Sequence, residues 1–228
     1  MSIPYLNGRY LLPFIVNGRQ VKRLQINGQN IYIDQPVTFT DPVAQQVCVE
    51  RFGLNGNISS QLIYRVYSTG NWFQGRTDLV HFTELQNFTS LKTLGDDCFN
   101  GCTNLTDLKI PQNVTTICPR CFKDCASWAS EFELWIPKVS VVNREAFRGC
   151  KALKKIGFGT SLSIINALAF ADCDSLENLT IHASNPPQIA ADILQNSPNC
   201  MIYVYSRSLN SYKSASGWAD YKDRIFAM

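Results

Sequence analysis

A four-residue motif, Phe-x-x-Cys, recurs four times in the middle of the chain and constrains the fold more than any other feature. The copies begin at Phe99, Phe122, Phe147 and Phe170, so they are separated by 23, 25 and 23 residues. A fixed period of this length indicates a repeat protein, in which each unit buries its apolar face only against its neighbours. Periods of about 20–50 residues are typical of proteins built by stacking one short unit on the next.

Apolar residues between the motifs also keep a common register. The shared offsets are those of Leu105, Leu108, Ile110, Val114 and Ile117 after Cys102, and of Leu153, Ile156, Phe158, Leu162 and Ile165 after Cys150. The alternating Leu-x-Ile pieces predict short strands, and the Phe-x-x-Cys motifs predict turns that return the chain to the next layer. The unit at Phe122 is longer, which predicts a bulged loop around residues 128–132.

Stacking of such units predicts two internal columns of side chains. We expect an aromatic ladder and, beside it, a column of small apolar thiols. The members are Phe99, Phe122, Phe147 and Phe170, and Cys102, Cys125, Cys150 and Cys173. Zinc would require four thiolate or imidazole ligands in tetrahedral geometry, and only Cys118 falls outside the repeat pattern in this region. We therefore favour packing over metal binding, and we expect reduced thiols for all nine cysteines.

The repeated segments, residues 105–117 above all, resemble the BspA-type leucine-rich repeats of bacterial surface proteins and of some phage and protozoan proteins. The ending, residues 199–204 with Tyr212–Trp218 and Arg224–Ile225, is similar to the closing segment of such proteins in Bacteroides-like bacteria. The resemblance covers about residues 78–228. It implies a short leucine-rich repeat solenoid, an α+β repeat fold, with a binding role and no chemistry.

The front of the chain has a different pattern, in which Asn7-Gly8, Asn17-Gly18 and Asn27-Gly28 predict tight β-hairpins. Residues 1–40 weakly resemble N-terminal segments of phage virion proteins with patterns like Val-Lys-x-Leu-x-Ile-Asn-Gly. We expect four parts in the chain. They are a β-hairpin anchor or oligomerisation segment (1–40), a helical N-terminal cap (41–77), leucine-rich repeats (78–181) and a C-terminal cap (182–228).

Several chemistries lack support in the sequence. The formal net charge is only +3 with scattered basic residues, so we expect no nucleic acid binding, and no apolar run is long enough to cross a bilayer. The loop at Gly53, Asn55, Asn57 and Leu62 lacks the carboxylates of an EF-hand, so we expect no calcium. Only His81 and His182 are available as imidazole bases, and neither lies in a catalytic motif. We expect neither an enzyme nor a cofactor.

Recognition is the function that remains. We expect a non-catalytic display module, with Trp72, Phe73, Trp128, Phe132 and Trp135 as its candidate binding surface. The expected partner is a protein or a glycan, and residues 1–40 are expected to contact other virion proteins or to form a homo-oligomer. The opening residues do not resemble a secretory signal peptide, which favours a virion component over the alternative, an exported adhesin at the bacterial cell surface.

Overall fold

The fold is known from a computed structural model, which describes residues 37–52, 58, 60–128, 134–190 and 192–228 and the backbone of four short strands before them. Those strands form two antiparallel pairs, and each pair encloses an Asn-Gly dipeptide. Their bounds are β1 (Ile15–Val16), β2 (Arg19–Gln20), β3 (Arg23–Ile26) and β4 (Gln29–Tyr32). The two strand pairs agree with hairpins at Asn17-Gly18 and Asn27-Gly28, although all three Asn-Gly dipeptides lie outside the described residues. The anchoring or oligomerising role of residues 1–40 stays a prediction.

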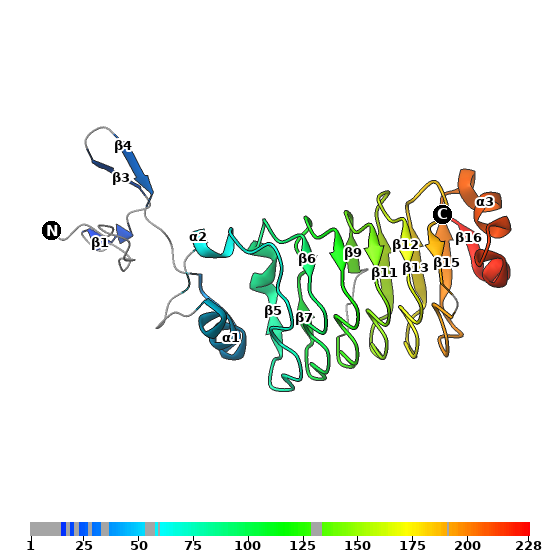
Figure 1. The fold of residues 1–228 in the computed structure, drawn as a ribbon, viewed down its shortest axis with the longest axis horizontal. Helices are drawn as coiled ribbons and strands as arrows, with labels where there is room; N and C mark the ends of the chain where they lie inside the picture. The colour runs from blue at the N-terminus through cyan, green and yellow to red at the C-terminus, as the bar shows by residue number, and fades with distance from the viewer. Residues whose placement is uncertain are drawn as a thin grey trace.

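The repeats form a solenoid whose coils stack along the longest axis of the molecule (Figure 1). Each of two parallel sheets takes one strand from each successive coil. The narrow sheet contains β6 (Thr93–Leu94), β8 (Thr116–Ile117), β10 (Val141–Val142), β12 (Ile164–Ile165) and β14 (Gln188–Ile189). The wide sheet contains β9 (Leu134–Ile136), β11 (Lys155–Phe158), β13 (Asn178–Ile181), β15 (Met201–Val204) and β16 (Ile225–Ala227). In the first coils β5 (His81–Phe82) pairs with β7 (Asp107–Leu108), and η1 (Thr83–Asn87) follows β5.

Phenylalanine rings stack through the interior from coil to coil. Ring centroids lie 5.3 Å apart for Phe99 and Phe122, 5.2 Å for Phe122 and Phe147, and 5.5 Å for Phe147 and Phe170. Phe73 extends the column by one coil, 5.1 Å from Phe99 and nearly parallel to it. Phe73 is fully buried, so its prediction as a binding residue is wrong. This first coil departs from the Phe-x-x-Cys motif because Arg76 stands where the other copies have cysteine.

The cysteine column is buried and also donates hydrogen bonds. Each Sγ lies close to the backbone carbonyl oxygen of the phenylalanine in the preceding coil, at 3.1 Å for Cys102 and Phe73 and 3.2 Å for Cys125 and Phe99. Ser197 takes the same place in the last coil, where its Oγ donates to Phe170 O over 2.9 Å. Burial raises the pKa of the Cys102 thiol to about 12, so the thiol stays protonated and remains a donor.

Phe99, Phe122, Phe147 and Phe170 each lie between two residues with left-handed backbone conformation, at positions −2 and +2. For Phe122 these are Arg120 and Asp124, with φ of 55° and 58°. At the +2 position three other coils have glycine, Gly75, Gly101 and Gly149, for which this conformation carries no steric cost. Two such residues per coil turn the chain sharply enough to return it to the next strand.

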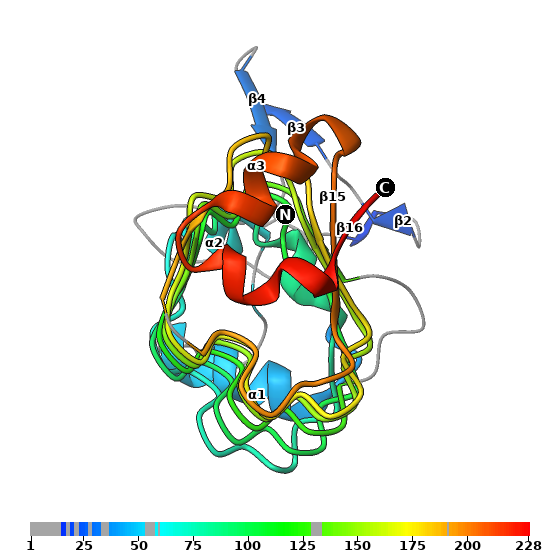
Figure 2. The same ribbon diagram turned by 90° about the vertical axis from the view of Figure 1, so that its right-hand side faces the viewer.

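Helices cover both ends of the stack (Figures 1 and 2). At the start, α1 (Pro42–Phe52) buries Ala44, Val47 and Cys48, and the short α2 (Ser60–Ile63) follows. At the other end lie η2 (Ser206–Ser208), α3 (Leu209–Ser214) and η3 (Trp218–Arg224). There the Tyr212 hydroxyl donates to Ala183 O over 2.8 Å, and Trp218 Nε1 donates to Pro187 O over 2.7 Å.

Asp41 fixes α1 onto the first coil through both carboxylate oxygens. Oδ1 accepts the backbone N–H groups of Val43 and Ala44 at the start of the helix. Oδ2 accepts those of Val80 and His81 from the first coil, each over 2.9 Å. Burial acts to raise the pKa of Asp41, but these four backbone donors outweigh it and hold the pKa below 3.8.

Replacing Phe122 by alanine removes a ring that contacts Phe99, Phe147 and Trp128. We expect the unfolding free energy to fall by about 3–5 kcal/mol in chemical denaturation, because the closed stack cannot fill the cavity. Phe122→Leu is the matched variant, with an expected loss of about 1 kcal/mol. An alanine variant as stable as the parent would show that the ring stacking does not support the solenoid.

Replacing Asp41 by asparagine leaves one oxygen acceptor and places an amide donor among backbone donors. We expect the unfolding free energy to fall by about 2 kcal/mol at pH 7. Because the folded pKa of Asp41 is depressed, its contribution is complete above 3.8 and disappears as the pH falls through the lower folded value. Asp41→Asn should therefore reduce the acid sensitivity of the fold in urea titrations between about pH 2 and 5.

The exposed carboxylate of Asp78, which pairs with Arg76, provides the control. We expect Asp78→Asn to change the unfolding free energy by less than about 0.5 kcal/mol. Equal effects of the two substitutions would contradict the role of Asp41 as the link between the helix and the first coil.

Candidate functional site

The outer face of the wide sheet carries one residue per strand in a common register. Trp135 lies beside Gly157, Gly157 beside Thr180, Thr180 beside Tyr203, and Tyr203 beside Phe226. The residues on either side of this row, such as Ile156 and Phe158, face the core. The row is therefore free of the packing demands of the ladder, and Trp135 and Phe226 in it are 40% and 43% exposed.

Two glycines let Trp135 reach across a neighbouring strand. Its ring meets the ring of His182 edge to face, with centroids 4.8 Å apart. Trp135 belongs to β9 and His182 follows β13, and both strands pair with β11, so the contact bridges the intervening strand. Gly157 on that strand and Gly159 just after it have no side chain that could obstruct the contact. A Cβ at Gly159 would also overlap the carbonyl oxygen of Pro137, so a residue with a side chain does not fit at this position.

Further rings continue this surface toward the C-terminal end of the stack. His182 contacts Tyr205 with ring centroids 5.0 Å apart, and its Nδ1 lies 2.8 Å from the Tyr205 hydroxyl. The guanidinium of Arg207 lies 4.5 Å from the Tyr205 ring centre, a cation–π contact. The aromatic strip, as we define it, consists of Trp135, His182, Tyr203, Tyr205 and Phe226.

Of the five aromatic residues predicted to bind a partner, the structure places only Trp135 in this strip. Trp128 is only 2% exposed and packs 5.0 Å from Phe122, so its prediction as a surface residue is corrected in the same way as that of Phe73. Trp72 is half-buried and contacts Phe52 of α1, where it joins the N-terminal helix to the first coils. Phe132 lies outside the described residues.

Sequence reasoning missed the other members of the strip, although a signal for them existed. His182 was considered only as a catalytic base, and Tyr203, Tyr205 and Phe226 were assigned to the C-terminal cap. Aligning the strands at one-coil intervals would have placed Tyr203 at the outward position of Trp135. The Phe-x-x-Cys motif ends before the last coils, so it gives no register for those strands.

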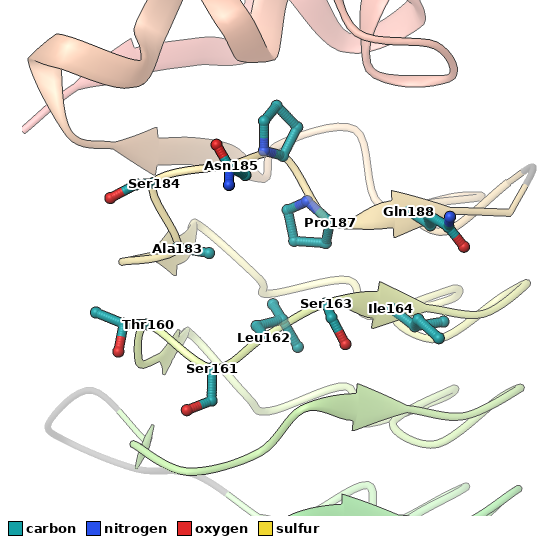
Figure 3. A pocket seen from close by; sticks show the side chains of 11 residues that line it. Thr160, Ser161, Leu162, Ser163, Ile164, Ala183, Ser184, Asn185, Pro187 and Gln188 are labelled. Atoms are coloured by element: carbon teal, nitrogen blue, oxygen red, sulfur yellow. The ribbon is translucent and has the colours of Figure 1, made fainter.

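A pocket of about 510 Å3 opens beside the strip, between the connections that lead from the wide sheet to the narrow sheet (Figure 3). Strand register fixes the lengths of the last three such connections. They comprise residues 137–140, 159–163 and 182–187, which are four, five and six residues respectively. Because the last connection is longer than the one beneath it, the two separate between His182 and Gln188, and the pocket forms there.

In the turns next to the ladder phenylalanines, charged side chains pair with one another. Arg120 pairs with Asp97 over 2.7 Å, and Lys123 Nζ donates to a carboxylate oxygen of Glu145 over 2.8 Å. Hydrogen bonding from Lys123 lowers the pKa of Glu145, so that carboxylate is already engaged. No set of three or more histidine, cysteine or acidic side chains within the described part of the chain is arranged to bind a metal ion. All nine cysteines, which lie within that part, carry free thiols.

No helix among the described residues has the length and apolarity needed to cross a bilayer.

None of the curated proteins matches the chain. A leucine-rich repeat protein from Bacteroides ovatus has a solved structure that aligns with 25% identity and a TM-score of 0.47, over 60% of this chain and 35% of its own. The chain therefore spans about a third of that protein. Internalin C2 from Listeria monocytogenes aligns with 14% identity and a TM-score of 0.35, over 86% of this chain and 96% of its own.

The family model of the BspA type leucine rich repeat region matches residues 71–201 in six copies, more than half of the 228-residue chain. The match begins just before Phe73, in agreement with the additional coil seen in the aromatic ladder. Leucine-rich repeats of this kind generally mediate protein interactions, without catalysis. The chain belongs to the BspA-type leucine-rich repeat family.

Proposed function

We propose that the chain is a display module of a phage virion, which presents the outer face of its wide sheet to a protein partner. The observation that carries the binding role is the exposed aromatic strip, since aromatic residues are enriched where proteins bind one another. The strip lies on strands held in register by the core, so its rings are positioned before a partner arrives. A preorganised surface loses little conformational entropy on binding.

The thiols and imidazoles of the chain do not form a nucleophilic site of the usual kind. Burial raises the pKa of Cys102, Cys173 and Cys200 to about 12, and a protonated thiol is a poor nucleophile. His182 has its Nδ1 beside the Tyr205 hydroxyl, and His81 has its Nδ1 3.4 Å from Thr106 Oγ1. The geometry therefore favours binding over turnover.

The virion assignment rests on the front of the chain, where residues 1–40 contain the Asn-Gly hairpins. In this proposal the hairpin segment attaches the module to other virion proteins or to further copies of itself, and the repeats project outward. The alternative is an adhesin of the same family at the bacterial cell surface, which would use the same sheet face. The two differ in location and not in binding surface.

Location is tested by probing purified phage particles and washed bacterial cells with an antibody against the repeats. We expect the chain to copurify with particles through a density gradient, in constant ratio to the major capsid protein. A signal confined to the surface of uninfected cells would exclude the virion assignment and leave the adhesin.

The binding face is tested with a Trp135→Ser/Phe226→Ser double variant of the labelled full chain. The retention of this variant on washed bacterial cells should be at least about tenfold lower than that of the parent, equivalent to 1.4 kcal/mol, because two exposed rings of the strip are lost. Tyr64→Ser/Tyr67→Ser is the matched control, since those tyrosines are 48% and 64% exposed and lie outside the strip. If both double variants lose retention equally, or neither does, the strip is not the binding face.

The role of the front segment is tested by the native mass of the full chain and of a truncation that lacks residues 1–36. Val37 and Phe39 pack against the solenoid core, so the truncation should retain its fold. We expect an oligomeric full chain and a monomeric truncation in light scattering. An identical mass per chain for both would count against self-assembly through the hairpins.

A further inference from the structure

The pocket between residues 160–164 and 183–188 has a lining without any charged side chain. Hydroxyl and amide groups surround it, from Thr160, Ser161, Ser163, Ser184, Asn185 and Gln188. Its apolar part consists of Leu162, Ala183, Pro186 and Pro187 with Ile164, and Leu162 and Ala183 are each 3% exposed. A volume of about 510 Å3 lies in the range of small-molecule sites, roughly 300–1,000 Å3.

Most polar groups of the lining are not used by the protein itself. Ser163 Oγ donates to Ser140 O over 2.9 Å in the neighbouring coil. Within the part of the chain that the structure describes, the side chains of Thr160, Ser161, Ser184 and Asn185 make no hydrogen bond to protein. Each of these groups both donates and accepts, so together they suit a ligand that offers donors and acceptors in similar number.

The frame around these groups is held on three sides. His182 N donates to Phe158 O over 3.0 Å and Gln188 N donates to Ser163 O over 2.8 Å, at the two ends of the opening. From the C-terminal cap, Tyr212 holds the carbonyl of Ala183 and Trp218 holds that of Pro187. The longer connection therefore keeps its distance from the shorter one, and the opening is built into the fold.

We propose that this pocket binds a neutral saccharide of one or two sugar units. A pyranose carries C–H groups on its faces and hydroxyl groups around its edge, which matches an apolar patch next to uncharged hydroxyl and amide groups. A charged ligand would find no counter-ion in the lining, and burying its charge would cost free energy. This site is separate from the aromatic strip, and the proposal goes beyond the protein interaction assigned to the wide sheet.

The test uses the full chain, labelled with 15N and titrated with methyl glycosides of glucose, galactose, mannose and N-acetylglucosamine. At least one glycoside should shift the amide signals of residues 160–163, 183–185 and 188 in a saturable manner. Asn185→Ala removes an amide from the lining, and Ser161→Trp places a ring in the opening. Each should weaken the affinity by about tenfold or more, and thermal unfolding should show that both variants remain folded.

Gln112→Ala provides the matched control, since this exposed amide lies in an earlier coil and outside the lining. It should bind with the affinity of the parent. Three outcomes would overturn the proposal. They are no saturable shift with any glycoside, binding by Asn185→Ala and Ser161→Trp with the affinity of the parent, or stronger shifts from glucuronic acid or an uncharged tripeptide. Retention of the variants on whole cells, measured in parallel, separates a failure of this pocket from a failure of the strip.

Discussion

Stacking of one coil on the next is the interaction on which the rest of this structure depends. Strands as short as two residues cannot bury an apolar face alone, and they persist because each pairs with the same strand of the neighbouring coils. Inside, the Phe99 and Phe122 rings lie 5.3 Å apart, while their coils are joined outside by the Arg120–Asp97 ion pair. The repeat period therefore sets both the core and the surface.

A stack of this kind has two open ends, and the chain uses different chemistry to cover them. At the first coil a single carboxylate, Asp41, joins the start of a helix to two backbone N–H groups of the solenoid. At the last coil the buried side chains of Tyr212 and Trp218 join the cap to the solenoid by donating hydrogen bonds to backbone carbonyl groups. The second cap also shapes the surface, because the carbonyls that it holds border the pocket beside β14.

The fold was predictable from the sequence because a ladder repeats residue types as well as spacing. Four copies of Phe-x-x-Cys indicated the stacked rings, whereas the coil at Phe73 does not carry the motif because Arg76 replaces its cysteine. The binding surface was less predictable, since tryptophan serves the core and the surface equally well. Trp128 fills space next to Phe122, and Trp135 lies outside only because its strand neighbours, Leu134 and Ile136, face inward.

Amide hydrogen exchange across the ladder tests most directly whether the coils and their caps form one cooperative stack. The amides of Phe73, Phe99, Phe122, Phe147 and Phe170 each donate to a carbonyl of the next coil, over 2.7–2.9 Å. If both ends are covered as described, all five should exchange with nearly the same free energy, that of global unfolding. Strong protection of Phe122 with rapid exchange at Phe73 and Phe170 would contradict the account, because the terminal coils would then open independently.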